Sequence, residues 1–306
     1  MNPDLAQSPS IDEAAELLSS HPDYRLVRRL VPTSKFSSPS GNVARGVIVD
    51  TETTGLNQDT DKIIEVSILA FTFDTNTGEV FEVVDVLTSF EDPGQPISAE
   101  STAIHGITDE MVSGKRIDDD RVNQIVAGAK VVIAHNASFD RPLLERRLPI
   151  FESLPWACSF QEVDWSGEGI GSAKLEYIAY QYGFFYDAHR AEMDCYAVLE
   201  VLRRPLPVSK KIPLLHLFNR TTEKDWVIGA IGSPFETKDI LRQRGYRWQA
   251  DRKIWAVSCN TDKAKEEIEW LKANVYKKDR VKLEFEPRDS LSRYSRRNAE
   301  RVVKEV

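Results

Sequence analysis

Two carboxylates placed directly after a buried strand constrain this chain more than any other feature of its sequence. The apolar run 46–49 predicts a buried strand, and Asp50 and Glu52 follow it. Residues at positions i and i+2 of a strand point to the same face, so these two side chains lie side by side. Ionising two neighbouring carboxylates is costly, and a bound divalent cation removes that cost. The pair therefore predicts a metal site, provided that other parts of the chain supply further ligands.

Two later stretches supply such ligands. Asp140 follows the apolar run 130–135, which predicts a central, parallel strand. His189 stands just before a helix expected over 190–202, and Asp194 lies in the otherwise apolar stretch of that helix, which continues to residue 202. Taken singly, Asp140 is a common helix N-terminal acid, and the other two are ordinary surface residues. Taken together with the first pair, they predict one shared cleft.

The complete set of ligands predicts the chemistry. Oxygen ligands select Mg²⁺ or Mn²⁺, and the sequence has no cluster of cysteine or histidine that would hold Zn²⁺. Two such cations can stabilise both the attacking and the leaving oxygen at a scissile phosphate. An imidazole, with a pKa near 6.5, suits the general base. We therefore predict a two-metal hydrolase whose catalytic residues are Asp50, Glu52, Asp140, His189 and Asp194.

The order of the predicted elements indicates an α/β fold. Strands expected at 47–50, 62–73 and 80–90 precede alternating strands and helices, which suggests a mixed sheet flanked by helices. Residues 1–9 are expected to be disordered, and the pattern Ser10 to Glu13 predicts the start of a helix. The expected parts are a helical appendage and linker (1–44), the catalytic domain (45–205), a proline-containing linker (206–222), a small α+β module (223–276) and a basic tail (277–306), which reads as a solvated helix or a disordered segment.

Charge is distributed unevenly along the chain. Residues 206–306 hold 23 basic and 15 acidic residues, whereas residues 1–205 hold 17 and 33. This asymmetry fits either two ordinary charged surfaces or a metal site in the first part and a polyanion-binding surface in the second. Three scattered cysteines, no secretory signal and no apolar stretch of membrane-spanning length favour a reducing, cytoplasmic location.

Three short motifs resemble those of a known family. Residues 50–55, 135–140 and 189–194 resemble the exonuclease motifs of the DEDDh (DnaQ-like) 3′–5′ exonucleases, the family of the proofreading epsilon subunit of bacterial DNA polymerase III. Residues 103–108 resemble the segment between the first two motifs, and the resemblance covers roughly 45–205. It implies an RNase H-like fold with a mixed five-stranded sheet. It also implies metal-dependent release of nucleoside 5′-monophosphates from DNA 3′ ends, in repair, proofreading or end-processing.

The resemblance also implies a role for each matching residue. Asp50 would bridge two ions, Glu52 and Asp194 would bind the first, Asp140 would support the second, and His189 would deprotonate the attacking water. The terminal nucleotides would contact a further set: Thr53, Gly55, Leu56, His105, Asn136 and Phe139. The N-terminal helix and the long C-terminal extension depart from the polymerase subunit and put a stable polymerase partnership in doubt.

Three alternatives stay open at this point. The first is an RNA-trimming 3′–5′ exoribonuclease, because discrimination depends on how the pocket treats the 2′-OH. The second is an accessory subunit that mainly binds a DNA polymerase or another repair partner. The third is a nucleic-acid-binding protein with vestigial catalysis, against which the five intact catalytic positions argue.

The small module allows two interpretations. Its pattern of a Lys-Asp helix, Gly-x-x-Trp and Lys-x-Trp is similar to small domains of undescribed function. Trp248 and Trp255 are either simply its core or, together with basic neighbours, part of an auxiliary DNA- or RNA-binding surface. The candidate nucleic-acid contacts are Arg244, Arg247, Arg252 and Lys253.

Overall fold

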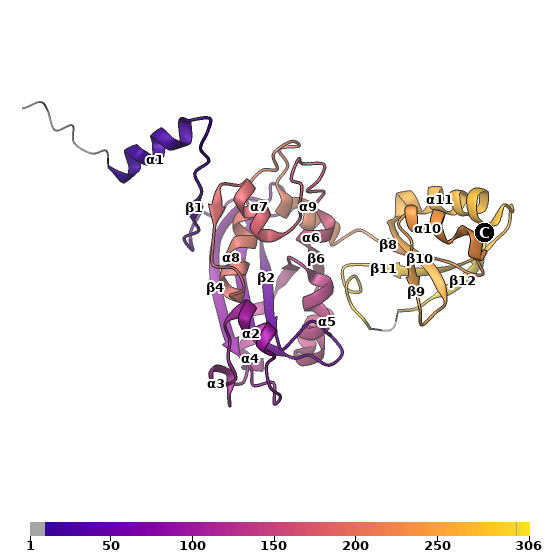
Figure 1. Cartoon of the computed structure of the whole chain (residues 1–306), viewed down its shortest axis with the longest axis horizontal. Helices are drawn as coiled ribbons and strands as arrows, with labels where there is room; N and C mark the ends of the chain where they lie inside the picture. The colour runs from indigo at the N-terminus through magenta and orange to yellow at the C-terminus, as the bar shows by residue number, and fades with distance from the viewer. Residues whose placement is uncertain (1–9, 298) are drawn as a thin grey trace, which may run out of the picture.

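The computed structural model describes residues 10–297 and 299–306, in which two five-stranded sheets form two units that lie side by side (Figure 1). The prediction of disorder for residues 1–9 falls outside this range. Helix α1 (Ile11–Ser20) begins at the predicted capping box of Ser10 and Glu13. Throughout the described ranges, every helix is too short or too polar to cross a membrane.

A mixed five-stranded sheet, in the order β4-β3-β2-β5-β6, forms the large unit. Strand β2 pairs antiparallel with β3 and parallel with β5, and β5 also pairs parallel with β6. The predicted mixed five-stranded sheet is confirmed. The parallel strand predicted at 130–135 is β5. The strands are β2 (Val43–Thr53), β3 (Ile63–Asp74), β4 (Val80–Phe90), β5 (Ala129–Ala134) and β6 (Trp156–Cys158).

Helices cover both faces of this sheet because its central strands are apolar on both sides. In β2, Ile48 packs with the helix residues Cys195 and Leu199 on one face, whereas Val47 packs with Ile125 on the other. The covering and connecting helices are α2 (Ala99–His105), α3 (Asp109–Val112), α4 (Asp119–Val126), α5 (Ala137–Arg147), η1 (Pro149–Ser153), α6 (Ser159–Glu162), α7 (Leu175–Gln181) and α8 (Ala191–Leu202). A short parallel pair, β1 (Arg28–Arg29) and β7 (Phe184–Phe185), ties the N-terminal segment to this unit.

An antiparallel five-stranded sheet, in the order β12-β11-β8-β10-β9, forms the small unit. Its core gathers Ile228, Leu241, Tyr246 and Leu283, so the helices cover one face of the sheet. The predicted helix stop at Gly245 has φ +98°, a conformation that glycine adopts without strain. The elements are β8 (Asp225–Ala230), η2 (Phe235–Thr237), α10 (Lys238–Gln243), β9 (Arg247–Gln249), β10 (Ile254–Asn260), α11 (Thr261–Trp270), the π-helical η3 (Leu271–Tyr276), β11 (Lys282–Arg288) and β12 (Val302–Glu305).

Two predictions about the second half of the chain are wrong. The expected linker 206–222 contains helix α9 (Pro213–Arg220), because a proline with its fixed φ fits the first position of a helix. The expected tail 277–306 supplies β11 and β12 instead of a solvated helix. Strand β11 pairs with β8, and Leu283 and Phe285 thereby reach the core of the small unit. A strand this short was hidden in the sequence because its burial depends on partners more than 50 residues away in the sequence.

A turn-rich segment between β11 and β12, here called the docking segment (289–297), leaves the small unit and binds the large one. The Trp156 amide, on the outer strand β6, donates to the Ser290 carbonyl at 2.8 Å. Arg141 of α5 is fully buried and donates to three carbonyls of the segment. The small unit accordingly lies beside the β6 edge of the large sheet (Figure 1).

Candidate active site

Three carboxylates meet where β2 ends and α8 begins. Asp50 and Glu52 lie on one face of β2, as their spacing predicts, and Asp194 lies in the first turn of α8. One oxygen from each carboxylate falls within 4.8 Å of the others, and all three residues are half-buried. This geometry suits a shared divalent cation, because carboxylate oxygens are the ligands that such ions prefer.

The fourth predicted carboxylate, Asp140, lies beside this cluster and is buried. It stands in the first turn of α5, which begins at Ala137 and so includes residues expected in the preceding turn. Thr51 donates its hydroxyl to Asp140 Oδ1 at 2.8 Å. The charge of Asp140 also contributes to the raised pKa of Asp50, which places the two carboxylates in one electrostatic field.

The pKa values of all four carboxyl groups are raised. Burial is the largest cause for Asp50, and the neighbouring charge of Asp194 follows it. Burial, with the charges of Asp194 and Glu65, raises the pKa of Glu52 to about 8. Burial likewise raises the pKa of Asp140 to about 7 and raises that of Asp194. Carboxylates that lie close together and away from water form a strong ligand set for a cation. A bound cation offsets both the cost of burying their charges and the repulsion between them.

Asp194 is fixed by two hydrogen bonds. The Tyr186 hydroxyl donates to one oxygen at 3.0 Å, and the Arg190 backbone N–H donates to the other at 3.1 Å. The predicted base His189 precedes Arg190, has an exposed side chain and adopts φ +63°. Few residues adopt this left-handed conformation, and it turns the chain sharply before α8. The role of Tyr186 could not be predicted from the sequence, because this turn determines which residue its hydroxyl contacts.

The sequence analysis also missed Glu65, a buried carboxylate on β3. It is the cross-strand partner of Glu52, and its side chain is 1% exposed. One carboxylate oxygen accepts from the Ala191 N–H at 3.2 Å, and the other lies 3.5 Å from the guanidinium of Arg190. Glu65 thus joins β3 to the first residue of α8. The only signal in the sequence was an acid within an otherwise apolar strand.

Three predicted nucleotide-binding residues follow Glu52, at the end of β2 and in the loop after it. Thr53 is buried and donates to the Gly55 carbonyl at 2.6 Å. A side chain at Gly55 would collide with the Asp61 carboxylate, so glycine is needed here for packing within the protein. Leu56 is 85% exposed. A leucine this exposed, four residues after Glu52, is available to contact an arriving ligand.

The other predicted nucleotide contacts differ in how exposed they are. His105 is 5% exposed, and its Nδ1 accepts from the Ile107 N–H at 3.0 Å. Its Nε2 is buried and has no hydrogen-bond partner in the described part of the chain. Asn136 is exposed and Phe139 is half-buried at the start of α5. The buried Nε2 of His105 is therefore an unpaired polar atom, which calls for an explanation in a native structure.

Comparison with known proteins decides the family. The model of the exonuclease family RNase_T matches residues 47–202, about half of the chain. The chain belongs to this exonuclease family. One relative is a PolC-type DNA polymerase III of Thermotoga maritima, which is 25% identical over 72% of this chain and 16% of the relative. Another is a DNA polymerase III subunit epsilon-like protein of Rhodobacter capsulatus, which is 38% identical over 33% of this chain and 14% of the relative. The chain thus spans only about a sixth of the length of these relatives.

Among solved structures, one similar protein is exonuclease X in complex with 5′ overhanging duplex DNA. It is 25% identical, covers 55% of this chain and 98% of its own, and has a TM-score of 0.41. The region matched by the family model contains every predicted catalytic residue of the sequence analysis. The large unit, which holds this region, is therefore named the exonuclease domain.

The structure divides the four candidate nucleic-acid contacts of the small unit. Arg244 pairs with Glu267 at 3.1 Å, and its guanidinium lies 4.9 Å from the Trp270 ring centroid. Arg252 is largely buried and pairs with two glutamates of β11. Arg247 and Lys253 are exposed and form no ion pair with any described residue. Only the latter two have charges free to meet a ligand.

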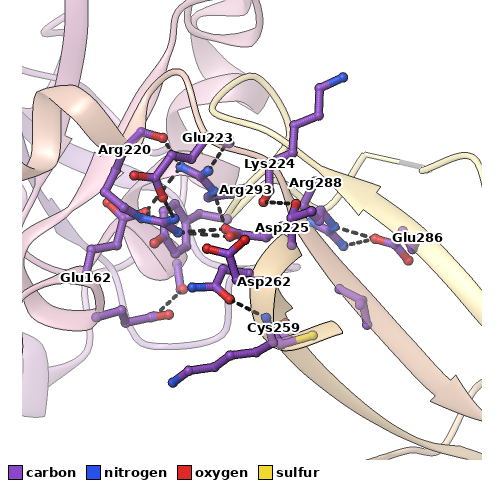
Figure 2. A pocket seen from close by; sticks show the side chains of 18 of the residues that line it. Glu162, Arg220, Glu223, Lys224, Asp225, Cys259, Asp262, Glu286, Arg288 and Arg293 are labelled. Carbon is purple, nitrogen blue, oxygen red and sulfur yellow. Dashed lines mark hydrogen bonds and ion pairs between the residues drawn. The ribbon is translucent and has the colours of Figure 1, made fainter. Parts of the chain in front are cut away.

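A cleft of about 1110 Å³ separates the exonuclease domain from the small unit (Figure 2). At one end, Figure 2 shows Arg220 and Arg293 converging on the carboxylates of Glu162 and Asp225. Because these ion pairs join α6, α9, β8 and the docking segment, they hold the two walls together. On the domain side the lining reaches Ser138, two residues before Asp140. The lining includes residues from the exonuclease domain, the docking segment and the small unit, and the four site carboxylates are not among them.

Proposed function

We propose that this chain is a metal-dependent 3′–5′ exonuclease that releases nucleoside 5′-monophosphates from DNA 3′ ends. The observation that carries the proposal is the meeting of Asp50, Glu52 and Asp194 within 4.8 Å in the matched exonuclease region. DNA is favoured as the substrate because the relatives are named as DNA polymerase III proteins. Those names also make a polymerase a candidate partner of this chain.

The four carboxylates fit two divalent cations, Mg²⁺ or Mn²⁺. Asp50, Glu52 and Asp194 would hold the first, and Asp50 and Asp140 the second. Bound there, the cations would stabilise the negative charge that develops on the attacking and leaving oxygens. Tyr186 and Arg190 fix Asp194 in place by their hydrogen bonds. The raised pKa values support this assignment, since cations and not protein side chains are left to neutralise the cluster.

His189 is proposed as the general base. It stands one residue before Arg190, whose N–H donates to Asp194, and its charge partly offsets the burial that raises the pKa of Asp194. The imidazole therefore lies near the cluster while its side chain stays open to water. In this position it can accept the proton of a water that attacks the terminal phosphodiester.

The residues that follow Glu52 and those at the start of α5 are proposed to bind the terminal nucleotide. Leu56 and Phe139 offer apolar surface to the last bases, and the unpaired Nε2 of His105 can donate to a sugar or phosphate oxygen once a ligand or a local shift uncovers it. Thr53, Gly55 and Asn136 are proposed to contact the same nucleotide.

A nuclease assay tests the proposal. Purified protein receives 3′-terminal single-stranded DNA, duplex DNA or RNA, with Mg²⁺, Mn²⁺ or EDTA, and Asp50→Ala serves as the inactive control. We expect metal-dependent release of mononucleotides from the 3′ end of DNA, and none from Asp50→Ala. The absence of metal-dependent release on every substrate overturns the proposal. A strong preference for RNA overturns the choice of substrate and keeps the enzyme class.

The base is tested separately with His189→Asn. Asparagine tolerates the left-handed backbone of residue 189, so this substitution removes the imidazole with less strain than alanine does. We expect kcat to fall by roughly 10²- to 10⁴-fold, the usual contribution of a general base, with the metal dependence retained. A kcat near that of the wild type would show that His189 is not the base.

A further inference from the structure

We propose that the N-terminal strand β1 positions Asp194, one of the proposed metal ligands, through the short segment that precedes α8. This segment, the β7 turn (184–190), contains β7, Tyr186 and His189. Strand β1 precedes the region that the exonuclease model matches, which begins at residue 47. The inference rests on the proposed function and extends it, because it gives part of the N-terminal appendage a role in holding a metal ligand.

Strand β7 depends on β1 for its pairing. In the described part of the chain, β1 is the only strand partner of β7, and the two form a separate two-stranded sheet. The Arg28 N–H donates to the Gly183 carbonyl at 3.0 Å, and the Leu30 N–H donates to the Phe185 carbonyl at 2.8 Å. A two-stranded pair is only marginally stable by itself, so further contacts are needed to keep it closed.

Side chains of the N-terminal segment supply these contacts. Arg29 forms an ion pair with Asp187 at 2.7 Å, and its guanidinium lies 4.9 Å from the Phe185 ring centroid. Arg25 donates to two carbonyls at the C-terminal end of α7, at 2.9 Å each. Leu30 packs against the core of the exonuclease domain. The N-terminal segment is therefore attached both to the β7 turn and to the helix before it.

The β7 turn connects this pair of strands to Asp194. Residues two apart in an extended segment point to the same side, and Phe184 and Tyr186 both pack against the core of the exonuclease domain. Phe185, between them, faces Arg29. The Tyr186 hydroxyl donates to one oxygen of Asp194 at 3.0 Å. Opening the pair of β1 and β7 would thus displace the hydroxyl that orients Asp194.

A displaced Asp194 would bind a cation less tightly. Its other oxygen accepts from the Arg190 N–H, so donors at the two ends of residues 186–190 hold both oxygens. Hydrogen-bond partners of metal-binding side chains are typically worth about 10- to 100-fold in metal affinity or activity. The proposed base His189 lies between these donors in the sequence, so kcat should depend on the same segment.

The test compares Arg28→Pro with Arg28→Ala in the full chain. The Arg28 side chain is exposed, and proline removes both this side chain and the N–H that donates to Gly183, whereas alanine keeps the N–H. We expect metal-free Arg28→Pro to bind Mn²⁺ about 10- to 100-fold more weakly in isothermal titration calorimetry, with a similar fall in kcat. Arg28→Ala should bind Mn²⁺ as the wild type does, and KM for single-stranded DNA should stay unchanged in both.

Tyr186→Phe identifies the route of the effect. This variant removes only the hydroxyl and should itself weaken Mn²⁺ binding about 10- to 100-fold. Adding Arg28→Pro to Tyr186→Phe should then cause little further loss, because the contact through which β1 acts is already absent. Tyr182→Phe removes a hydroxyl that donates to the Pro205 carbonyl, and this matched control should leave the Mn²⁺ affinity unchanged.

Circular dichroism first establishes that each variant is folded. An unchanged Mn²⁺ affinity in folded Arg28→Pro or in folded Tyr186→Phe overturns the inference, and a lower Tm alone would assign β1 a purely structural role. Additive losses in the double variant also overturn it, because they place the effect of β1 outside the contact between Tyr186 and Asp194. If the wild type binds no Mn²⁺ and releases no nucleotides, the proposed function fails instead, so the two failures are distinguishable.

Discussion

Asp140 and Arg141 are neighbours in the sequence and belong to opposite kinds of buried charge. Asp140 joins the acidic cluster, here Asp50, Glu52, Asp140 and Asp194, where like charges lie together. Arg141 belongs to the clasp, the ion pairs and hydrogen bonds that join α5 to the docking segment. Its guanidinium pairs with Glu145 at 2.7 Å and donates to carbonyls of Ser290, Leu291 and Arg293.

The two regions differ in whether the protein itself compensates the charge. In the clasp, each buried charge has its partners within the chain, and Glu145 also accepts from the Ser295 hydroxyl at 2.6 Å. In the acidic cluster, Tyr186, Thr51 and the backbone N–H of Arg190 orient the carboxylates but do not neutralise them. A buried charge that the protein itself neutralises indicates a structural role. A group of buried like charges without such partners indicates a ligand-binding site. One turn of α5 carries both.

The largest expected effect is the opposite response of activity and stability to Asp50→Asn. We expect nuclease activity to fall by at least about three orders of magnitude, because several kcal/mol of charge stabilisation are lost. The free energy of unfolding of the metal-free protein should rise at neutral pH, since one of four repelling groups loses its charge. Kinetics and chemical denaturation measure the two quantities. Asp279→Asn, the same change at an exposed loop position, should alter neither.

Arg141→Met should have a comparably large effect, on stability and not on activity. The substitution breaks a buried ion pair with Glu145 and removes one donor from each of three carbonyls, so the free energy of unfolding should fall by about 3–5 kcal/mol. Arg280→Met, at an exposed position, is the matched control and should cost almost nothing. The double variant Arg141→Met/Glu145→Met should recover part of the loss.

The activity of Arg141→Met tests whether the clasp and the acidic cluster have separate functions. At a temperature where Arg141→Met remains folded, we expect its kcat to stay within several-fold of the wild type. If kcat instead falls as far as in Asp50→Asn, the clasp is part of the catalytic machinery and the two regions are not separable. Residual activity per folded molecule, with folding followed by circular dichroism, decides between these outcomes.

A smaller effect is a pH dependence of stability with a defined sign. The pKa of Glu52 is raised from 4.5 to about 8, so the folded state retains its proton where the unfolded state loses it. The metal-free protein should therefore be most stable below about pH 4.5, as far as this group is concerned, and should lose that contribution as pH rises toward about 8. Added Mg²⁺ or Mn²⁺ should raise Tm more at pH 8 than at pH 5. An equal rise in Tm at both values would contradict cation binding by this cluster.

The smallest predicted effect concerns Glu65, which shares features of the clasp and of the acidic cluster. Glu65→Gln keeps an acceptor for the Ala191 N–H and removes one negative charge near the cluster. We expect the apparent affinity for Mg²⁺ to fall about 5-fold, the equivalent of about 1 kcal/mol of Coulomb attraction, with little change in Tm. Glu65→Ala should in addition lower Tm, because a buried N–H loses its partner. If Gln and Ala behave alike, Glu65 acts by its charge alone.

The sequence predicted the acidic cluster well and its surroundings poorly. Asp50 and Glu52 were identifiable because a strand places residues i and i+2 on one face, whatever its neighbours are. Glu65 and Tyr186 were not, because their roles depend on which strand pairs with β2 and how the chain turns before α8. Of the four basic candidates, Arg244 and Arg252 looked free in the sequence and are held by ion pairs in the fold.

The amino-acid sequence by itself determined the local elements and the residue types of the cluster. Apolar runs, capping residues and the spacing of acids act within a few residues, so they are legible without the fold. The tertiary structure decided what happens to each charge. Arg141 is compensated by carbonyls about 150 residues later in the chain, whereas the charge of Asp140, its neighbour, faces those of other acids. Compensation depends on contacts between distant segments, and for that reason only the folded chain separates a stabilising charge from a functional one.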